Sequence, residues 1–123
     1  MEDILRVEVE PMGKPRMTQR DKWIKRPPVV RYHLFSHAIK YCAEELEYVV
    51  TDTLSLTFII SMPKSWSNKK KKEMDGQPHT VKPDLDNIVK AFKDSLCEDD
   101  SFIHTYQNVR KIWGEKGCIL IHR

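Results

Sequence analysis

Residues 82–96 read KPDLDNIVKAFKDSL, and the apolar letters of this stretch predict an amphipathic helix. They recur three or four positions apart, which is the spacing that gathers side chains on one helix face. Asp84 stands where an N-cap belongs, because its carboxylate can accept a hydrogen bond from a free backbone N–H of the first turn. We therefore expect a helix from Asp84 to about Cys97, with a buried face made of Leu85, Ile88, Phe92 and Leu96.

Apolar patterns upstream of this helix predict two strands and a second helix. LRVEVE at 5–10 alternates apolar and charged residues, which is the period of a half-buried strand. TLSLTFIIS at 53–61 alternates in the same way, and Pro63 opposes its continuation. Between them, apolar residues recur at helical spacing and predict a helix at 36–49.

The remaining elements are expected to be a short helix and two strands. NKKKKEM at 68–74 follows Ser67, a residue that caps helices well. IHTYQNVRKIW at 103–113 and CILIHR at 118–123 are strand-like runs, and the glycines of the intervening GEKG favour a hairpin between them.

The mixture of strands and helices predicts one α+β domain over residues 1–123. A chain of 123 residues suits a single hydrophobic core. Because helices and strands do not alternate strictly, we expect a small mixed, largely antiparallel sheet with two main helices. Two basic stretches without clear periodicity, at about 11–35 and 63–82, are expected to be loops, and long loops in compact domains usually bind something.

Composition indicates a folded protein of the cytoplasm that does not enter a membrane. The acidic, alternating start is unlike a signal peptide, and no run approaches the ~20 apolar residues of a membrane span. Cys42, Cys97 and Cys118 are odd in number and widely spaced, which favours neither a disulfide framework nor a CxxC metal site.

Charge is unevenly distributed along the chain. Residues 11–40 carry eight Lys and Arg against one acid, and 63–82 carry six Lys against two acids. Residues 84–100 instead carry six acids against two Lys. Basic stretches beside a compact acidic one suit a polyanionic partner held around a bound cation, although charge runs are more often solvated surface.

The acids at 84 and 86 have two simple structural explanations. Asp84 can cap the helix and both carboxylates can complement its dipole, while Lys90 lies four residues after Asp86 and could form an ordinary ion pair with it. However, EDD at 98–100 follows the helix directly and adds three more acids. Carboxylates that gather in space repel one another unless a cation or proton neutralises them.

Metal-dependent nuclease chemistry would explain this pattern. Mg²⁺ is usually held by a few carboxylates, water and phosphate oxygens, and Mn²⁺ accepts similar ligands. In nucleases such ions activate water and stabilise the leaving oxygen, and a nearby lysine can stabilise the developing charge. The alternatives are a nucleic-acid-binding module without catalysis, whose acids merely cap a helix, and a nuclease that prefers flaps, forks or RNA.

The chain resembles the RusA-type Holliday-junction resolvases, many of which are encoded by prophages. The resemblance rests on MPKSWS followed by lysines, on PHTVKPDLDNIVKAFKDSL and on DDSFI, with a weaker similarity in GKPRMT. It implies a small α+β homodimer that cleaves four-way DNA junctions with Mg²⁺. It also implies functions in DNA recombination and repair.

Matching this pattern residue by residue assigns roles to five residues. The resemblance implies that Asp84, Asp86 and Asp100 are the essential, metal-binding carboxylates and that Lys90 is the catalytic lysine. Asp99 is the neighbour that could exchange roles with Asp100.

Basic and aromatic side chains are the candidates for DNA binding. Lysines placed along a backbone contact phosphates without reading sequence, and an exposed tryptophan can stack on a base. For Trp66, packing of its own loop onto the domain is at least as good an explanation. The candidates are Lys14, Arg16, Lys64, Trp66, Lys69, Lys70, Lys71, Lys72 and Lys82, with Arg20, Lys22, Trp23, Lys25, Arg26 and Arg31 extending the first basic arm.

Overall fold

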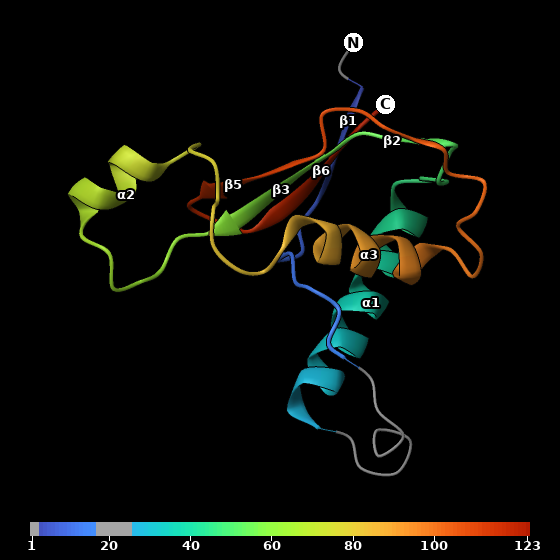
Figure 1. The fold of residues 1–123 in the computed structure, drawn as a ribbon, viewed down its shortest axis with the longest axis horizontal. Helices are drawn as coiled ribbons and strands as arrows, with labels where there is room; N and C mark the ends of the chain where they lie inside the picture. Colours follow the sequence, from blue (N-terminus) through green and yellow to red (C-terminus); the bar gives the residue numbers. More distant parts are fainter. Residues whose placement is uncertain (1–2, 17–25) are drawn as a thin grey trace.

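Three helices and six strands follow one another in the computed structural model, which describes residues 3–16 and 26–123 (Figure 1). The α+β class is confirmed. The elements are β1 (Ile4–Val7), α1 (Pro27–Glu45), β2 (Thr53–Leu54), β3 (Leu56–Ser61), α2 (Asn68–Met74), α3 (Leu85–Leu96), β4 (Thr105–Tyr106), β5 (Arg110–Gly114) and β6 (Cys118–His122).

Four of the strands form one mixed sheet in the order β1-β6-β3-β5. β6 pairs antiparallel with both β1 and β3, whereas β3 and β5 run parallel. β2 and β4 form a separate parallel pair. The expected hairpin between the last two strands is wrong, because β3 lies between β5 and β6 and the short link 115–117 has to cross its end.

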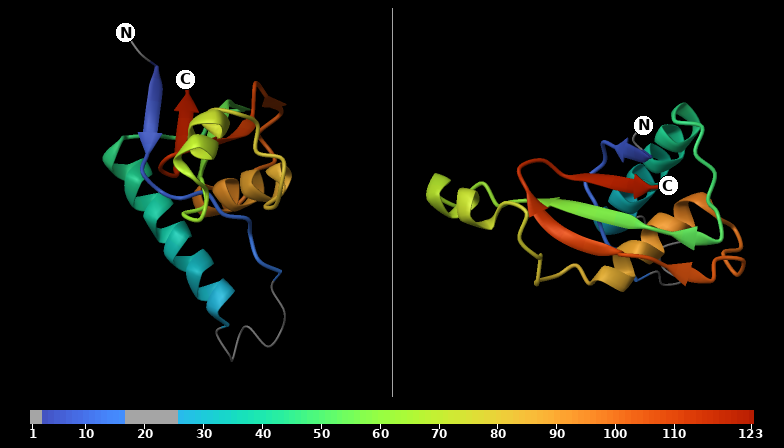
Figure 2. Two further views of the ribbon diagram at one scale, coloured as in Figure 1. Left: turned by 90° about the vertical axis from the view of Figure 1, so that its left-hand side faces the viewer. Right: turned by 90° about the horizontal axis from the view of Figure 1, so that it is seen from above.

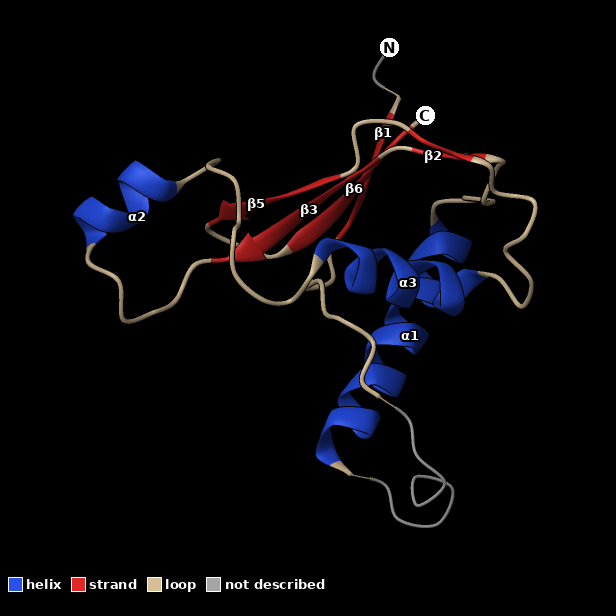
Figure 3. Cartoon of the chain, in the orientation of Figure 1, coloured by secondary structure: helices blue, strands red, loops and turns tan. Residues whose placement is uncertain are grey.

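Helices α1 and α3 cover one face of the sheet, and α2 projects beyond its end (Figures 2 and 3). The central strand β3 meets α3 through Phe58 and Phe92, whose rings contact edge to face at 6.5 Å between centroids. Both phenylalanines are fully buried. Apolar side chains of α1, α3 and the sheet therefore form a single core.

The predicted helices α2 and α3 are present. Ser67 caps α2 as expected, since its Oγ accepts a hydrogen bond from the backbone N–H of Lys70. α3 buries one strongly apolar face that includes Ile88 and Phe92. Among residues 3–16 and 26–123, no helix is long and apolar enough to cross a membrane.

Helix α1 differs from its predicted bounds at both ends. It begins at Pro27 rather than Ser36, so residues 27–35 belong to a helix and not to the expected basic loop. Proline is well suited to a first helical turn, where its missing N–H has no partner to lose. The helix ends at Glu45, because Glu47 takes a positive φ of 54°, and Val49 is 78% exposed beyond it.

The strand expected at 103–113 is interrupted. Asn108 has a φ of 52°, a left-handed conformation that breaks an extended strand. β4 and β5 therefore belong to different sheets.

The outer edge of β5 is covered by the segment that leads to α3. Gly76 N–H donates to the carbonyl of Trp113, the N–H of Trp113 donates to Gln77, and the N–H of His79 donates to Lys111. These bonds give the otherwise open edge a backbone partner. They also bring the chain along the sheet toward the start of α3.

Replacing Phe92 with alanine should test the contact on which the two layers depend. We expect the free energy of unfolding to fall by about 3–5 kcal/mol, because a fully buried ring is replaced by a cavity. Urea denaturation followed by circular dichroism measures this loss. The matched control is Phe102→Ala, whose ring is 47% exposed and should cost far less; equal losses would contradict the assignment of Phe92 to the core.

Candidate functional site

The first turn of α3 presents two exposed carboxylates. Asp84 occupies the N-cap position, yet its side chain makes no capping hydrogen bond. Asp86 accepts a hydrogen bond at one oxygen from the neighbouring N–H of Asn87, and both aspartates are exposed. The side chain of Asp84 therefore does not cap the helix, although capping is the simplest structural explanation for an acid at this position.

Lys90 lies one turn further along α3 and is also exposed. In the described part of the chain, no ion pair joins it to Asp86 or to another carboxylate. The ordinary ion pair between positions four apart is thus not formed either. The helix start carries two carboxylates and an ammonium group that remain available to a ligand.

Lys111 fixes the turn that precedes these aspartates. Its Nζ donates hydrogen bonds of 2.6 Å to the carbonyl oxygens of both Val81 and Pro83. The peptide bond between Lys82 and Pro83 in this turn is cis. A cation bound to two carbonyls holds the turn closed, so the position of Asp84 depends on the rigid strand β5.

The N-terminal segment packs on the same helix from the other side. A Cβ on Gly13 would lie 2.5 Å from Nδ2 of Asn87, so a larger residue here would displace this amide. The same Asn87 amide donates to the carbonyl of Lys14. The Lys14 ammonium forms a 2.7 Å ion pair with Asp94, and this hydrogen bond raises the pKa of Lys14.

Asp99 and Asp100 lie beyond the opposite end of α3. A helix of 12 residues is about 18 Å long, so these acids are separated from Asp84 and Asp86 by roughly that distance. Asp100 forms an ion pair of 3.2 Å with Lys93. A hydrogen bond from the Ser101 N–H lowers the pKa of Asp99. A single chain does not bring these acids to Asp84 and Asp86, and metal binding by them stays a prediction.

The start of α3 fits Mg²⁺ as a two-carboxylate site. Within residues 3–16 and 26–123, no three His, Cys, Asp or Glu side chains converge as a complete cage. Mg²⁺ does not require one, since it is commonly held by one or two carboxylates together with waters and substrate phosphates. Asp84 and Asp86 would supply those carboxylates.

The lysine-rich helix α2 extends away from the body of the domain (Figure 1). Lys69, Lys70 and Lys72 are exposed on it, while Lys71 is half-buried. Nζ of Lys70 lies 4.4 Å from the centroid of the Trp66 ring, which orders one end of this basic surface.

Trp66 packs its own loop onto the sheet, which is the structural alternative to base stacking for this residue. The centroids of the Trp66 and Trp113 rings lie 4.8 Å apart, and the centroid of the His79 ring lies 4.2 Å from that of Trp113. Stacking of Trp66 on a DNA base stays a prediction.

The other predicted DNA-binding residues are scattered. Arg16, Lys64 and Lys82 are exposed, whereas the charge of Lys14 is engaged by Asp94. Arg16 also accepts a hydrogen bond from Arg26 through its backbone carbonyl. Arg20, Lys22, Trp23 and Lys25 lie outside the described residues.

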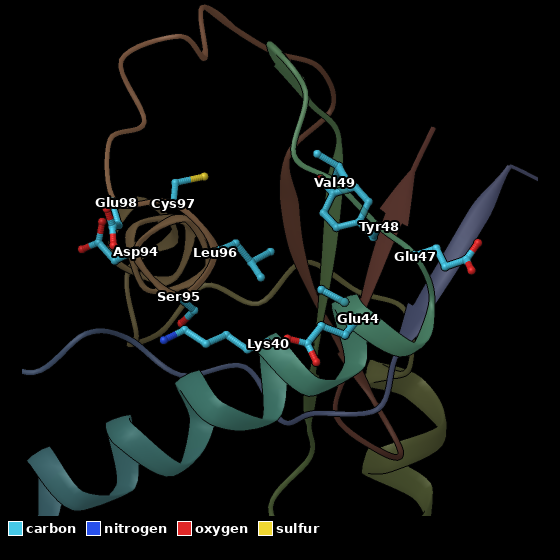
Figure 4. A pocket seen from close by; sticks show the side chains of 11 residues that line it. Lys40, Glu44, Glu47, Tyr48, Val49, Asp94, Ser95, Leu96, Cys97 and Glu98 are labelled. Atoms are coloured by element: carbon cyan, nitrogen blue, oxygen red, sulfur yellow. The ribbon is translucent and has the colours of Figure 1, made fainter.

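A separate groove of about 640 Å³ lies between the C-terminal halves of α1 and α3 (Figure 4). Lys40, Glu44, Asp94 and Glu98 contribute charged groups to it, and burial raises the pKa of the neighbouring Tyr48 to about 12. Because carboxylates outnumber cations there, the groove does not suit a phosphodiester. The sequence pattern did not indicate it.

Comparison with protein families gives a match over almost the whole chain. Residues 7–122 match the family model described as Endodeoxyribonuclease RusA. No curated protein and no solved structure matches.

His79 should make stability depend on pH. It is buried, its Nδ1 has no hydrogen-bond partner among the residues that the structure describes, and burial followed by the charge of Lys111 lowers its pKa. Below about pH 6.5 the unfolded chain therefore binds a proton that the folded chain resists, so stability falls as the pH drops. Urea unfolding at about pH 7.5 and about pH 5.5 should show a smaller loss in His79→Phe than in the parent protein. Equal losses would assign the effect to other groups.

Proposed function

The chain belongs to the RusA endodeoxyribonuclease family, and we propose that it resolves four-way DNA junctions by paired, Mg²⁺-dependent nicks. The observation that carries this proposal is the state of the α3 start. Asp84 and Asp86 are exposed, Asp84 makes no capping hydrogen bond, and within residues 3–16 and 26–123 no carboxylate forms an ion pair with Lys90.

Asp84 and Asp86 would hold the ion against the scissile phosphate. When bound, Mg²⁺ supplies Lewis-acid stabilisation of phosphate charge and lowers the pKa of a coordinated water. The aspartates position their oxygens from a helix start whose entry turn is fixed by Lys111. Preorganised groups of this kind cost little reorganisation during reaction.

Lys90 would stabilise charge that develops on the phosphate. It projects from α3 four residues after Asp86, and these positions are neighbours on a helix surface. No carboxylate of the described residues pairs with Lys90, so its ammonium group can face the reacting phosphate.

Asp100 and Asp99 are the predicted carboxylates whose role most needs an experiment. In one chain Asp100 neutralises Lys93 at the far end of α3. Cleavage by Asp100→Asn would limit the site to the α3 start. Loss of cleavage with an unchanged fold would place Asp100 in the reaction, by contact with the same junction or through a second subunit.

The active species is proposed to be a homodimer. A four-way junction has approximate two-fold symmetry, and its resolution requires two nicks in opposed strands. One chain offers one pair of aspartates at the start of α3, whereas a two-fold dimer offers two symmetrical pairs.

The carboxylate assignment is tested by cutting a labelled four-way junction. Asp84→Asn, Asp86→Asn and Lys90→Met should each abolish cleavage in Mg²⁺, because each removes a group proposed to act on the phosphate. Junction binding by the aspartate variants should survive or tighten, since negative charge near DNA is removed. Gel assays of cleavage and binding measure both effects.

The matched control for these variants is Glu115→Gln, which removes an exposed acid far along the chain from α3. It should cut normally. Undiminished cleavage by both aspartate variants would reject the site. Binding without any Mg²⁺-dependent cleavage by the parent protein would indicate a non-catalytic module, and preferred cutting of flaps, forks or RNA in a substrate panel would change the proposed substrate.

The exposed lysines of α2 should contribute to DNA affinity by neutralising phosphates. For Lys69→Gln/Lys72→Gln, the slope of log affinity against log salt should flatten by roughly one unit for each phosphate that the variant no longer neutralises. The weakening should be similar for all branched DNA, because lysine–phosphate pairs do not read sequence. Lys40→Gln/Lys116→Gln removes the same charge elsewhere and should leave the slope closer to that of the parent. Identical slopes in both double variants would indicate that the α2 lysines are solvated surface and do not contact DNA.

A further inference from the structure

Helix α1 carries a second apolar stripe on the side opposite its core face. Val30, Leu34 and Tyr41 are 40%, 66% and 64% exposed, and His37 is exposed between them. The residues that α1 buries in the core lie on the other side of the helix. No described segment covers the stripe, and α1 extends its N-terminal half away from the sheet (Figure 2).

The spacing of this stripe is that of a helix-pairing seam. From Val30 to Leu34, His37 and Tyr41 the steps are four, three and four residues. Alternation of three and four is the heptad spacing of positions that face another helix. A solvated helix face would instead carry mostly charged residues at these positions.

The surface of the stripe is also shaped to receive a side chain. A hollow of about 400 Å³ is lined by Val30, His33, Leu34 and His37. These residues stand at i, i+3, i+4 and i+7, the four-residue frame into which a side chain of a facing helix inserts. Tyr41, one turn beyond the hollow, is the large exposed side chain of the same stripe.

We propose that this stripe pairs with the same stripe of a second copy, in an antiparallel arrangement about a two-fold axis passing near His37. In this arrangement Tyr41 of each copy enters the hollow of the other, since the hollow and Tyr41 lie at similar distances on either side of His37. The inference gives an interface to the homodimer of the proposed function, but its geometry does not depend on nuclease activity.

Charges at the two ends of the stripe favour the antiparallel orientation. Exposed Arg31 lies near its start, and exposed Glu44 and Glu45 lie near its end. Antiparallel pairing places Arg31 beside the partner's Glu45, whereas parallel pairing would place like charges together. Opposed helix dipoles favour the same orientation.

Light scattering of the full chain tests this interface without DNA. The parent protein should be a dimer, and Leu34→Glu should be a monomer, because an introduced carboxylate would be buried at the seam. Leu34 is exposed in one chain, so the variant should keep the parental circular dichroism spectrum. Val49→Glu places the same acid at a more exposed apolar position outside the helix and should remain dimeric.

Cross-linking tests the position of the axis. His37→Cys should form a disulfide-linked dimer on mild oxidation, because residue 37 meets its own counterpart. Lys40→Cys, on a flank of α1, should cross-link no more than the parent with its native cysteines. A monomeric parent, a dimeric Leu34→Glu, or equal cross-linking at 37 and 40 would each overturn the interface. A dimeric Leu34→Glu or equal cross-linking would reject this interface and leave the homodimer and the Mg²⁺-dependent cleavage test untouched, whereas a monomeric parent would reject the homodimer as well.

Discussion

The attachment of residues 76–83 to β5 is the constraint on which the candidate site depends. Residues 76–79 form backbone hydrogen bonds with β5 along the edge of the sheet. The Lys111 ammonium then closes the following turn by binding two carbonyls. Two aspartates at the end of an unsupported loop would lose considerable conformational entropy on binding an ion. Here the sheet has already fixed the path of the chain that carries them.

A second set of contacts completes this support from the N-terminal side. Gly13 and Lys14 pack on Asn87 and Asp94, so one face of α3 is held by a segment some seventy residues earlier in the chain. The first residues of the GKPRMT stretch thus have a structural role, since they pack against α3. Lys14 is oriented toward an acid of the helix, which makes it a positioning group as well as a cation near the site.

The sequence predicted those elements whose apolar side chains all lie on one face. α3 was recognisable because Ile88 and Phe92 form one apolar face and the opposite face is polar. The start of α1 was predicted wrongly because apolar residues lie both on its core face and on the opposite, exposed face. With apolar residues on both faces, the helical period cannot be recognised in the sequence. The order of β5 and β6 could not be obtained from neighbouring sequence, since β3 separates them in space.

For the site, residue types were more informative than positions. The motif predicts the acids and Lys90 as site residues, and that assignment stays a prediction. The distance between Asp86 and Asp100 depends on α3 being straight and continuous between them. The two carbonyls bound by Lys111 belong to a turn that meets β5 only in the folded chain. Such long-range contacts leave no local pattern.

The pairing of β1 with β6 has a consequence for how the protein is made. Ile4 is in register with His122, so the sheet joins residues from the two ends of the sequence. During translation β1 has no partner until residues 118–122 have left the ribosome, and β3 lacks one of its neighbours for the same period. Contacts between such distant residues also slow folding. The growing chain must therefore keep an apolar, incompletely paired strand β3 from associating with other chains, a task suited to chaperones that bind nascent polypeptides.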